Sequence, residues 1–597
     1  MKRWKLIPLL VVVSVAHLHL VAAFTDEELS LPPSPARLAG IERAAASSGW
    51  GKLAAPLRAV AYRAYETNSQ SAEAWFSLSR WAALFGATDS DFVTHWSDAI
   101  KAGHLWSGGA EENVSVSNQP LSRHVSPALQ AWLLANPDFS AEFFSLVSPY
   151  DLLPRSFDIL SALQARYPKE FGPYANLALA IALVYDVPPP PGWPHGQVKP
   201  AALPRRLPDP AAAFGFWVNA DENGRTLLQL SRLPASQLKF VIDTPTPLTE
   251  LLWAQINVTI PLPVFAKAYD IVRYRVDRVQ QGQYVWPSDS YELPTIVKEG
   301  GICVDQAYFA CEVGKAKGIP TLFFSGAGRD AWHAWFGYLD QNHQWQLDAG
   351  RYTNQQLVTG FALDPQTWGV FSDHEVKFLA EGFRLLPSWR LACMNADFAA
   401  AYLADGNPRK AARAARVAIN YDPRHLGAWD TLLTAQTRLG APPMDRENLL
   451  REMKLAFQNY PDIEAPLVHQ IAASMRARGE GSAADFEEHQ FAQKVGPVRS
   501  DLNLDQDVQT MQNSMDHDLL DTQLRTYYAL LGKSGKGAGI EYFDRIVRPF
   551  VLHLQQLNYR REAQHAALQA QNTLHIEPDS ELDMEMRQLL NAIPLND

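Results

Sequence analysis

The stretch that decides the fold is "GGICVDQAYFACEVGKAKGIP", residues 300–320. Two glycines precede a cysteine, and the apolar spacing that follows predicts one helix, ending at Gly318 with Pro320 beyond it. Cys303 then falls in the first turn, where unpaired backbone N–H groups and the positive end of the helix dipole lower the pKa of a thiol. The sequence therefore predicts a reactive cysteine here. The alternative, a buried structural cysteine, suits Cys311 in the middle of the same helix.

A base for this thiol is expected on the strands that follow. From residue 321 the periodicity changes from helix to strand in "TLFFSG", "AWHAWFGYL" and "QWQLDAG". His333 lies on the second of these segments and Asp348 on the third. An even loop of two or four residues within "DQNH" would place both on one face of the sheet, where His333 can accept a proton and Asp348 can orient its ring. The alternative for His333 is a satisfied core histidine.

Together these motifs, "GGICVDQAYFACEVGKAKGIPTLFFSG", "HAWFGYL" and "WQLDAG", resemble the transglutaminase-like superfamily, a branch of the papain-like fold. The resemblance covers about residues 240–380. It implies that Cys303 is the nucleophile, His333 the general base and Asp348 the orienting acid of an amide acyl-transfer reaction. One departure is the Ala349-Gly350 pair, where the family often has a proline or threonine after the acid.

Two further features concern the expected site. The backbone N–H of Cys303 is one natural oxyanion donor, and the indole N–H of Trp286 is the candidate for a second; the alternative for Trp286 is a core residue. The aromatic run around His333 would help to exclude water, although we expect Trp332 and Trp335 to point to the opposite side of the strand, towards the core.

No metal or cofactor is expected. The three cysteines are an odd number, and Cys303 and Cys311 are about 12 Å apart along one helix, too far for a disulfide. The sequence has no His-x-x-x-His or cysteine cluster and no acidic calcium cluster, and His343 and His374 are expected at the surface. A net charge of −11 without a basic block argues against nucleic acid as a partner.

The N-terminus, "MKRWKLIPLLVVVSVAHLHLVAAFTDEE", has the layout of a secretory signal peptide and predicts export, to the outside or the periplasm. A retained N-terminal membrane anchor is the alternative, and no other segment reads as a membrane span. The chain divides into a signal peptide (1–23), an N-terminal helical region (24–185), a proline-rich connector and linker (186–239), the transglutaminase-like core (240–385), helical repeats (386–495) and a C-terminal helical region (496–597).

The repeats are similar to tetratricopeptide repeats. Tyr402, Ala411, Ala418 and Pro423 have the spacing of one unit, and Trp429 stands where the next unit often holds Trp. Small residues at the two alanine positions let paired helices approach closely. The alternative is an ordinary helical bundle. Such repeats would offer a surface for a protein partner.

The sequence thus predicts a multidomain α+β protein with a papain-like core, formed by a helix and an antiparallel sheet and flanked by helical regions. The function expected is that of an exported cysteine enzyme acting on amide bonds of a protein or peptide through a thioester, with hydrolysis favoured over amine transfer. The alternative is a non-catalytic binding protein whose helical repeats recognise a partner.

Overall fold

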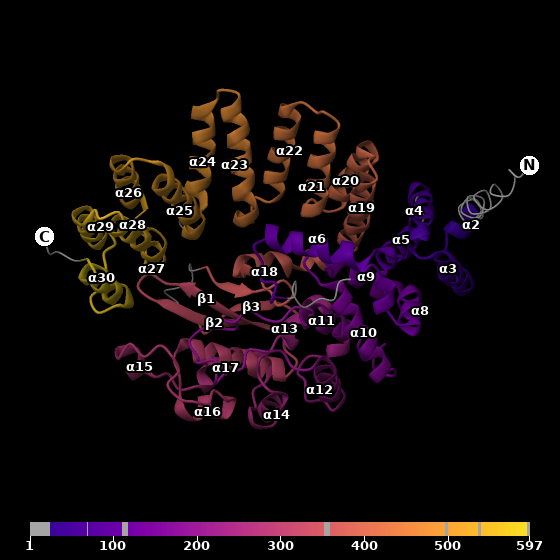
Figure 1. The fold of residues 1–597 in the computed structure, drawn as a ribbon, viewed down its shortest axis with the longest axis horizontal. Coiled ribbons are helices and arrows are strands. Elements are labelled where there is room, and N and C mark those ends of the chain that lie inside the picture. Colours follow the sequence, from indigo (N-terminus) through magenta and orange to yellow (C-terminus); the bar gives the residue numbers. More distant parts are fainter. Residues whose placement is uncertain are drawn as a thin grey trace, which may run out of the picture. The chain divides into compact units, whose positions relative to one another are not determined.

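The computed structural model describes residues 24–67, 70–109, 117–351, 359–495, 499–534 and 539–593, and the expected signal peptide lies outside them. The chain is a mostly helical multidomain protein with one small five-stranded antiparallel sheet near residues 321–372 (Figure 1). It divides into two compact units. Unit 1 comprises the chain up to Leu322 with Tyr338–Gln344 and Leu363–Val370; unit 2 comprises Phe323–Gly337, Trp345–Ala362 and the chain from Phe371 onward.

Unit 1 begins with helices joined by short loops, as the apolar periodicity predicts. Serine or threonine caps open several of them: Ser34 accepts a hydrogen bond from Arg37 N, and Thr88 accepts one from Asp91 N. The helices are α2 (Asp26–Leu29), α3 (Pro35–Ser48), α4 (Gly51–Glu66), α5 (Ala72–Gly86), α6 (Asp89–Ala102), η1 (Leu121–His124), α8 (Pro127–Ala135), α9 (Pro137–Leu146), α10 (Leu153–Arg166) and α11 (Ala175–Val184).

The proline-rich stretch 187–200 contains neither helix nor strand, since consecutive prolines have no amide hydrogen to donate and disfavour a helix. Helices resume at residue 210. They are α12 (Pro210–Glu222), η2 (Leu230–Arg232), α13 (Ala235–Ile242), α14 (Leu248–Asn257), η3 (Leu262–Ile271), α15 (Val276–Gln280), α16 (Leu293–Glu299) and α17 (Cys303–Ala316). Every residue of α17 after Cys303 is buried, and the helix packs against α13, α14, α16 and η3.

The sheet has the strand order β3-β2-β1-β4-β5, so the β1–β2–β3 meander lies at one edge. The strands are β1 (Thr321–Ala327), β2 (Trp332–Leu339), β3 (Trp345–Ala349), β4 (Phe361–Leu363) and β5 (Val370–Ser372). Ser325 pairs with Phe361 in the antiparallel β1–β4 ladder. The predicted change from helix to strand at residue 321 is confirmed.

After the sheet, unit 2 continues as helices, and those between residues 387 and 495 pack in succession, side by side in Figure 1. They are α18 (Asp373–Leu379), η5 (Gly382–Leu385), α19 (Pro387–Ala404), α20 (Pro408–Tyr421), α21 (Leu426–Arg438), α22 (Pro443–Ala456), α23 (Pro461–Ala477) and α24 (Gly481–Val495). Tyr402, Ala411, Ala418 and Trp429 are all buried, as the repeat spacing predicts.

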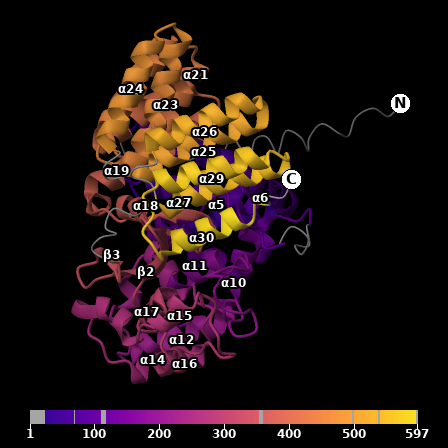
Figure 2. The same cartoon turned by 90° about the vertical axis from the view of Figure 1, so that its left-hand side faces the viewer.

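The helices of the C-terminal region lie together (Figure 2). They enclose a core of their own within unit 2, in which Tyr527 stacks on Phe550 at 4.5 Å between ring centroids. Its helices are α25 (Ser500–His517), α26 (Leu520–Ser534), α27 (Ile540–Tyr542), η7 (Phe543–Val547), α28 (Arg548–Gln556), α29 (Arg560–Thr573) and α30 (Glu581–Asn591). Among the residues described, no helix combines the length and apolar character that a membrane crossing requires.

Candidate active site

Cys303 is the first residue of α17, and its side chain is partly exposed. The side chain of Asp305 caps this helix start, because its Oδ2 accepts a hydrogen bond from Ile302 N at 2.8 Å. The thiol therefore lies in the first turn of the helix, at the positive end of the helix dipole. The predicted position of Cys303 in the first turn is confirmed.

Each of the two glycines before the helix is required for a different structural reason. Gly300 has a φ of +76°, and a Cβ atom there would lie 2.6 Å from Arg273 O. A Cβ on Gly301 would lie 2.3 Å from the Cβ of Asp305. Gly301 also accepts a backbone hydrogen bond from Arg275 N, at 2.8 Å. The glycines thus permit the positive φ and the close approach of the capping carboxylate.

A buried polar network holds the cap of α17. Arg278 pairs with Asp305 at 2.8 Å, and both side chains are almost wholly excluded from solvent. The Tyr291 hydroxyl donates to Asp305 Oδ1 at 2.9 Å and lies 3.2 Å from His195 Nε2. Burial raises the pKa of Asp305, while Ile302 N and Arg278 lower it. These residues were not singled out in the sequence, and their only signal is an acidic residue at the third helical position.

Trp286 belongs to this network as a core residue. Its indole N–H donates to Ser290 O at 2.9 Å, and its ring packs edge-on against Tyr291 and under the Arg278 guanidinium. The side chain is 1% exposed. The candidate oxyanion donor thus has its N–H engaged by a backbone carbonyl, which matches the alternative interpretation of Trp286.

The three cysteines differ in environment. Cys311 lies in the middle of α17 and is 2% exposed, and burial raises the pKa of its thiol well above the ordinary value. Cys393 lies on α19 and is partly exposed, like Cys303. Only Cys303 combines partial exposure with a position at a helix start.

His333 is the second residue of β2 and is 5% exposed. Its Nε2 lies 2.9 Å from Gly350 O. Because a carbonyl only accepts, this bond assigns the proton to Nε2 and makes Nδ1 the ring's acceptor. Burial lowers the pKa of His333 below its ordinary value, the Gly350 carbonyl opposes this, and the Arg351 charge adds to it. The neutral form that a base requires is therefore favoured.

The aromatic neighbours of His333 differ from the expectation. Trp335 stacks on the imidazole, with ring centroids 5.8 Å apart, so the expectation that it points to the opposite side was wrong. Residues two apart on a strand share a face, which explains the error. Trp332, one residue before His333, is 42% exposed.

The loop between β2 and β3 is odd, whereas an even loop was expected. Asp340 N donates to Gln344 O at 2.9 Å, which leaves the three residues 341–343 between them, and His343 has a φ of +57°. Counting back from this pair places Arg351 across from His333 and puts Asp348 on the other face of the ladder. Asn or glycine is the usual residue at a positive φ, so a histidine gave no signal for this turn.

The Asp348 carboxylate pairs with Arg351 at 2.6 Å and is 69% exposed. The Arg351 side chain is itself buried; it lies 4.4 Å over the Trp335 ring and 3.3 Å from Asp373. Asp373 is buried, which raises the pKa of its carboxyl. Arg351 and Gly350 are the residues that sequence reasoning missed at this end of the sheet. Cys303 belongs to unit 1, while His333 and Asp348 belong to unit 2.

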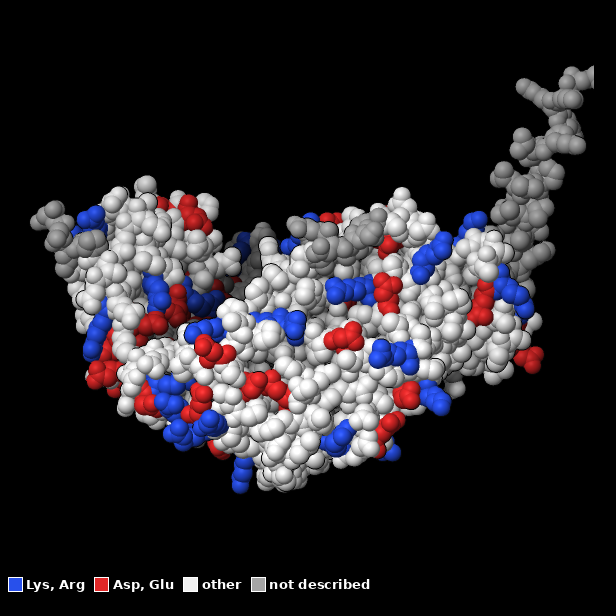
Figure 3. All heavy atoms as spheres, turned by 60° about the horizontal axis from the view of Figure 1, so that its bottom comes forward, with Lys and Arg blue, Asp and Glu red and all other residues white. Residues whose placement is uncertain are grey.

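Within the described ranges no three His, Cys, Asp or Glu side chains gather as a metal ion would require. His374 is partly exposed and lies 3.5 Å from Asp373. On the face in Figure 3, positive and negative side chains are interspersed and form no broad area of one sign.

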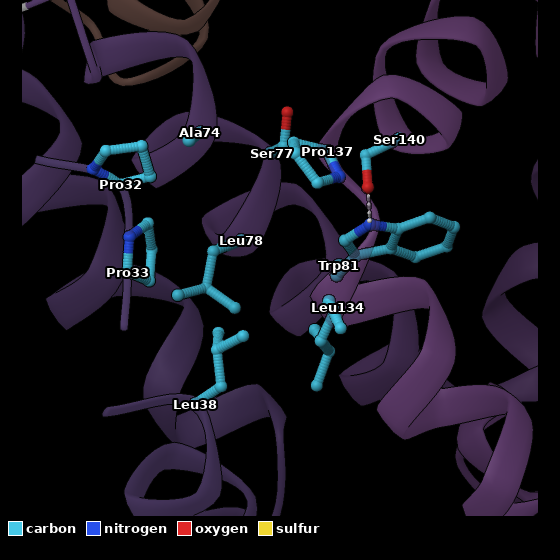
Figure 4. A pocket seen from close by; sticks show the side chains of 11 residues that line it. Pro32, Pro33, Leu38, Ala74, Ser77, Leu78, Trp81, Leu134, Pro137 and Ser140 are labelled. Carbon is cyan, nitrogen blue, oxygen red and sulfur yellow. Dashed lines mark hydrogen bonds between the residues drawn. The ribbon is translucent and has the colours of Figure 1, made fainter. Parts of the chain in front are cut away.

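A small pocket of about 60 Å³ lies in the N-terminal region, between the proline pair at 32–33 and Trp81 (Figure 4). The Nε1 of Trp81 donates a hydrogen bond to the hydroxyl of Ser140.

No protein-family model matches the chain, and a search of curated proteins finds no match either.

Proposed function

We propose that the chain is an exported, transglutaminase-like cysteine enzyme that acts on amide bonds of a protein or peptide through Cys303, His333 and Asp348. The observation that carries the proposal is the position of Cys303 as first residue of α17, behind a turn that two glycines and the Asp305 cap define. A buried neutral histidine on β2 supplies the base that such a thiol needs.

The reaction follows from these groups. His333 takes the proton of the thiol, and the thiolate attacks the carbonyl carbon of the amide. The oxyanion that forms is stabilised by N–H groups at the start of α17, including that of Cys303. The carbon–nitrogen bond breaks as the imidazolium gives its proton to the leaving amine, and a thioester remains on the sulfur. Water activated by His333 then releases a carboxylic acid; a primary amine in its place would give a new amide.

The third member of the triad acts through its neighbours in this proposal. Gly350 O fixes the ring of His333. Asp348 pairs with the Arg351 guanidinium, whose positive charge lowers the pKa of the imidazole. Asp348 thus supports the base without the direct contact that the resemblance implies. We expect hydrolysis to exceed amine transfer, because water is abundant at an exported enzyme.

The test offers glutamine-containing and cell-wall peptides together with a labelled primary amine, and follows the products by mass. Hydrolysed or deamidated product that disappears in Cys303→Ala, and persists in Cys393→Ala, supports the proposal. Cys303-dependent incorporation of the amine would reverse the preference for hydrolysis. The alternative is a non-catalytic protein that binds a partner through α19–α24. Absence of any product across a broad peptide set would favour this alternative.

A further inference from the structure

The short connection from β1 to β2, residues 328–331, ends two residues before His333 and is held by the C-terminal helices. Within unit 2, Ile540 N donates to Arg329 O at 2.8 Å, and Leu582 N donates to Asp330 O at 3.1 Å. The Arg329 guanidinium in turn donates to His575 O at 3.3 Å. Residues 540, 575 and 582 of the C-terminal region therefore bind two consecutive residues of this connection.

Trp332 is bound at both its backbone and its side chain. Its N–H donates to Glu581 Oε2 at 3.2 Å, and its indole Nε1 donates to Asp544 Oδ2 at 3.1 Å. Burial raises the pKa of Glu581. The residue directly before His333 is thus fixed by one side chain from η7 and one from α30.

The approach is close enough to require a glycine. A Cβ on Gly539 would lie 2.4 Å from Arg329 O and 2.7 Å from its Cα. Ala327, at the end of β1, packs against the hydrophobic core of the C-terminal region. Both ends of the connection are therefore held by the C-terminal region.

We propose that residues 539–593 of the C-terminal region position His333 through Trp332. The inference rests on the proposed function, since it assigns the region to the placement of that base. A strand residue directs its side chain according to the backbone on either side of it, and a base displaced by about 1 Å costs on the order of 100-fold in rate. Trp332 is a positioning residue in this account, because it acts on the reaction only through His333.

The first experiment measures the alkylation rate of Cys303 against pH in the full chain carrying Trp332→Phe, which removes the indole N–H. The matched control is Trp106→Phe: Trp106 is 37% exposed, and its Nε1 donates to Pro188 O at 2.8 Å. We expect at least a fivefold loss of rate in Trp332→Phe and less than a twofold change in the control. Asp544→Ala should reproduce the loss, whereas Asp544→Asn, which keeps an acceptor, should restore most of the rate. Equal rates in Trp332→Phe and the control would overturn the inference.

The second experiment needs no activity. The titration of the His333 imidazole is followed by NMR in ¹³C-histidine-labelled Cys303→Ala protein, with the resonance assigned through His333→Gln. Trp332→Phe should move its midpoint upward by about half a pH unit, because a looser strand end admits water and weakens the desolvation that lowers this pKa. An unreactive Cys303 would argue against the proposed function, while this shift would still support the positioning. An unchanged midpoint would argue against the positioning whatever the activity.

Discussion

His333 Nε2 and Gly350 O lie 2.9 Å apart, so a backbone carbonyl two residues beyond Asp348 holds the ring of the candidate base. A carbonyl fixes the tautomer and orientation of an imidazole as a carboxylate does, but it adds no full negative charge to stabilise the imidazolium. A histidine held in this way keeps a low pKa, in agreement with the effect of its burial. Such a group is mainly unprotonated at neutral pH, which is the form in which a base accepts a proton.

The first prediction concerns thiol reactivity. Cys303 should react with iodoacetamide well below pH 8, and His333→Ala should slow it about tenfold or more, because the thiol loses the base that accepts its proton. Asp348→Asn should have a smaller effect, since Asp348 acts through Arg351. Peptide mass spectrometry of the folded protein gives the rates at each cysteine. Cys393 should label as an ordinary thiol and Cys311 only after unfolding; equal pH profiles at Cys303 and Cys393 would contradict the assignment.

The second prediction concerns the turn before α17. Gly301→Ala should destabilise the protein by roughly 1–3 kcal/mol, because the new methyl group displaces the Asp305 cap. Urea unfolding measures the loss. Gly172→Ala is the matched control: no atom lies within 4 Å of a Cβ built there, so it should change stability little. A Gly301→Ala variant as stable as the control would mean that the turn relaxes without cost.

Local signals predicted the elements that carry the site. The start of α17 at Cys303 follows from glycines before an apolar periodic run, and β1 follows from a change to aromatic and β-branched residues at Thr321. These signals lie within a few residues of the features they predict. The same holds for Trp429, which was predicted from its place in the repeat unit and is buried.

The contacts that fix the residues around the candidate site come from distant parts of the chain. Asp305 pairs with Arg278, 27 residues earlier, and Trp332 donates to Asp544, 212 residues later. Periodicity carries no information about such pairs, because many arrangements of the same helices bury the same faces. The prediction for the loop after β2 was wrong for a different reason. One residue at a positive φ, His343, accompanies an odd instead of an even loop, and this places Asp348 on the other face of the sheet.

The third prediction concerns the helical repeats. Trp429 is 1% exposed and donates its indole N–H to Pro423 O at 2.8 Å. Trp429→Ala should lower the free energy of unfolding by roughly 3 kcal/mol or more, as for other buried aromatics. Leu455→Ala, at a position that is 66% exposed, is the control and should stay within about 0.5 kcal/mol of the wild type. Equal stability of the two variants would show that Trp429 does not anchor the repeat.

The last prediction concerns acid stability and starts from His195. Its imidazole is buried: Nε2 lies 3.2 Å from the Tyr291 hydroxyl, the ring packs edge-on against Tyr308, and Arg205 donates to the backbone carbonyl of His195. Burial, together with the nearby Arg205 charge, lowers the pKa of His195 to about 3. The unfolded chain, with a histidine pKa of about 6.5, therefore takes up this proton first as the pH falls. The stability linked to this group is complete above pH 6.5 and is lost progressively towards pH 3.

At pH 5 this loss amounts to about 2 kcal/mol, since each pH unit below 6.5 contributes about 1.4 kcal/mol. His195→Gln, which cannot titrate, should escape it. The unfolding free energy of the wild type minus that of the variant should therefore fall by about 2 kcal/mol between pH 7 and pH 5, measured by urea titration at each pH. His517→Gln, at an exposed position on α25, is the matched control and should leave this difference constant. A constant difference for His195→Gln as well would mean that the buried histidine is hydrated or protonated in the folded protein.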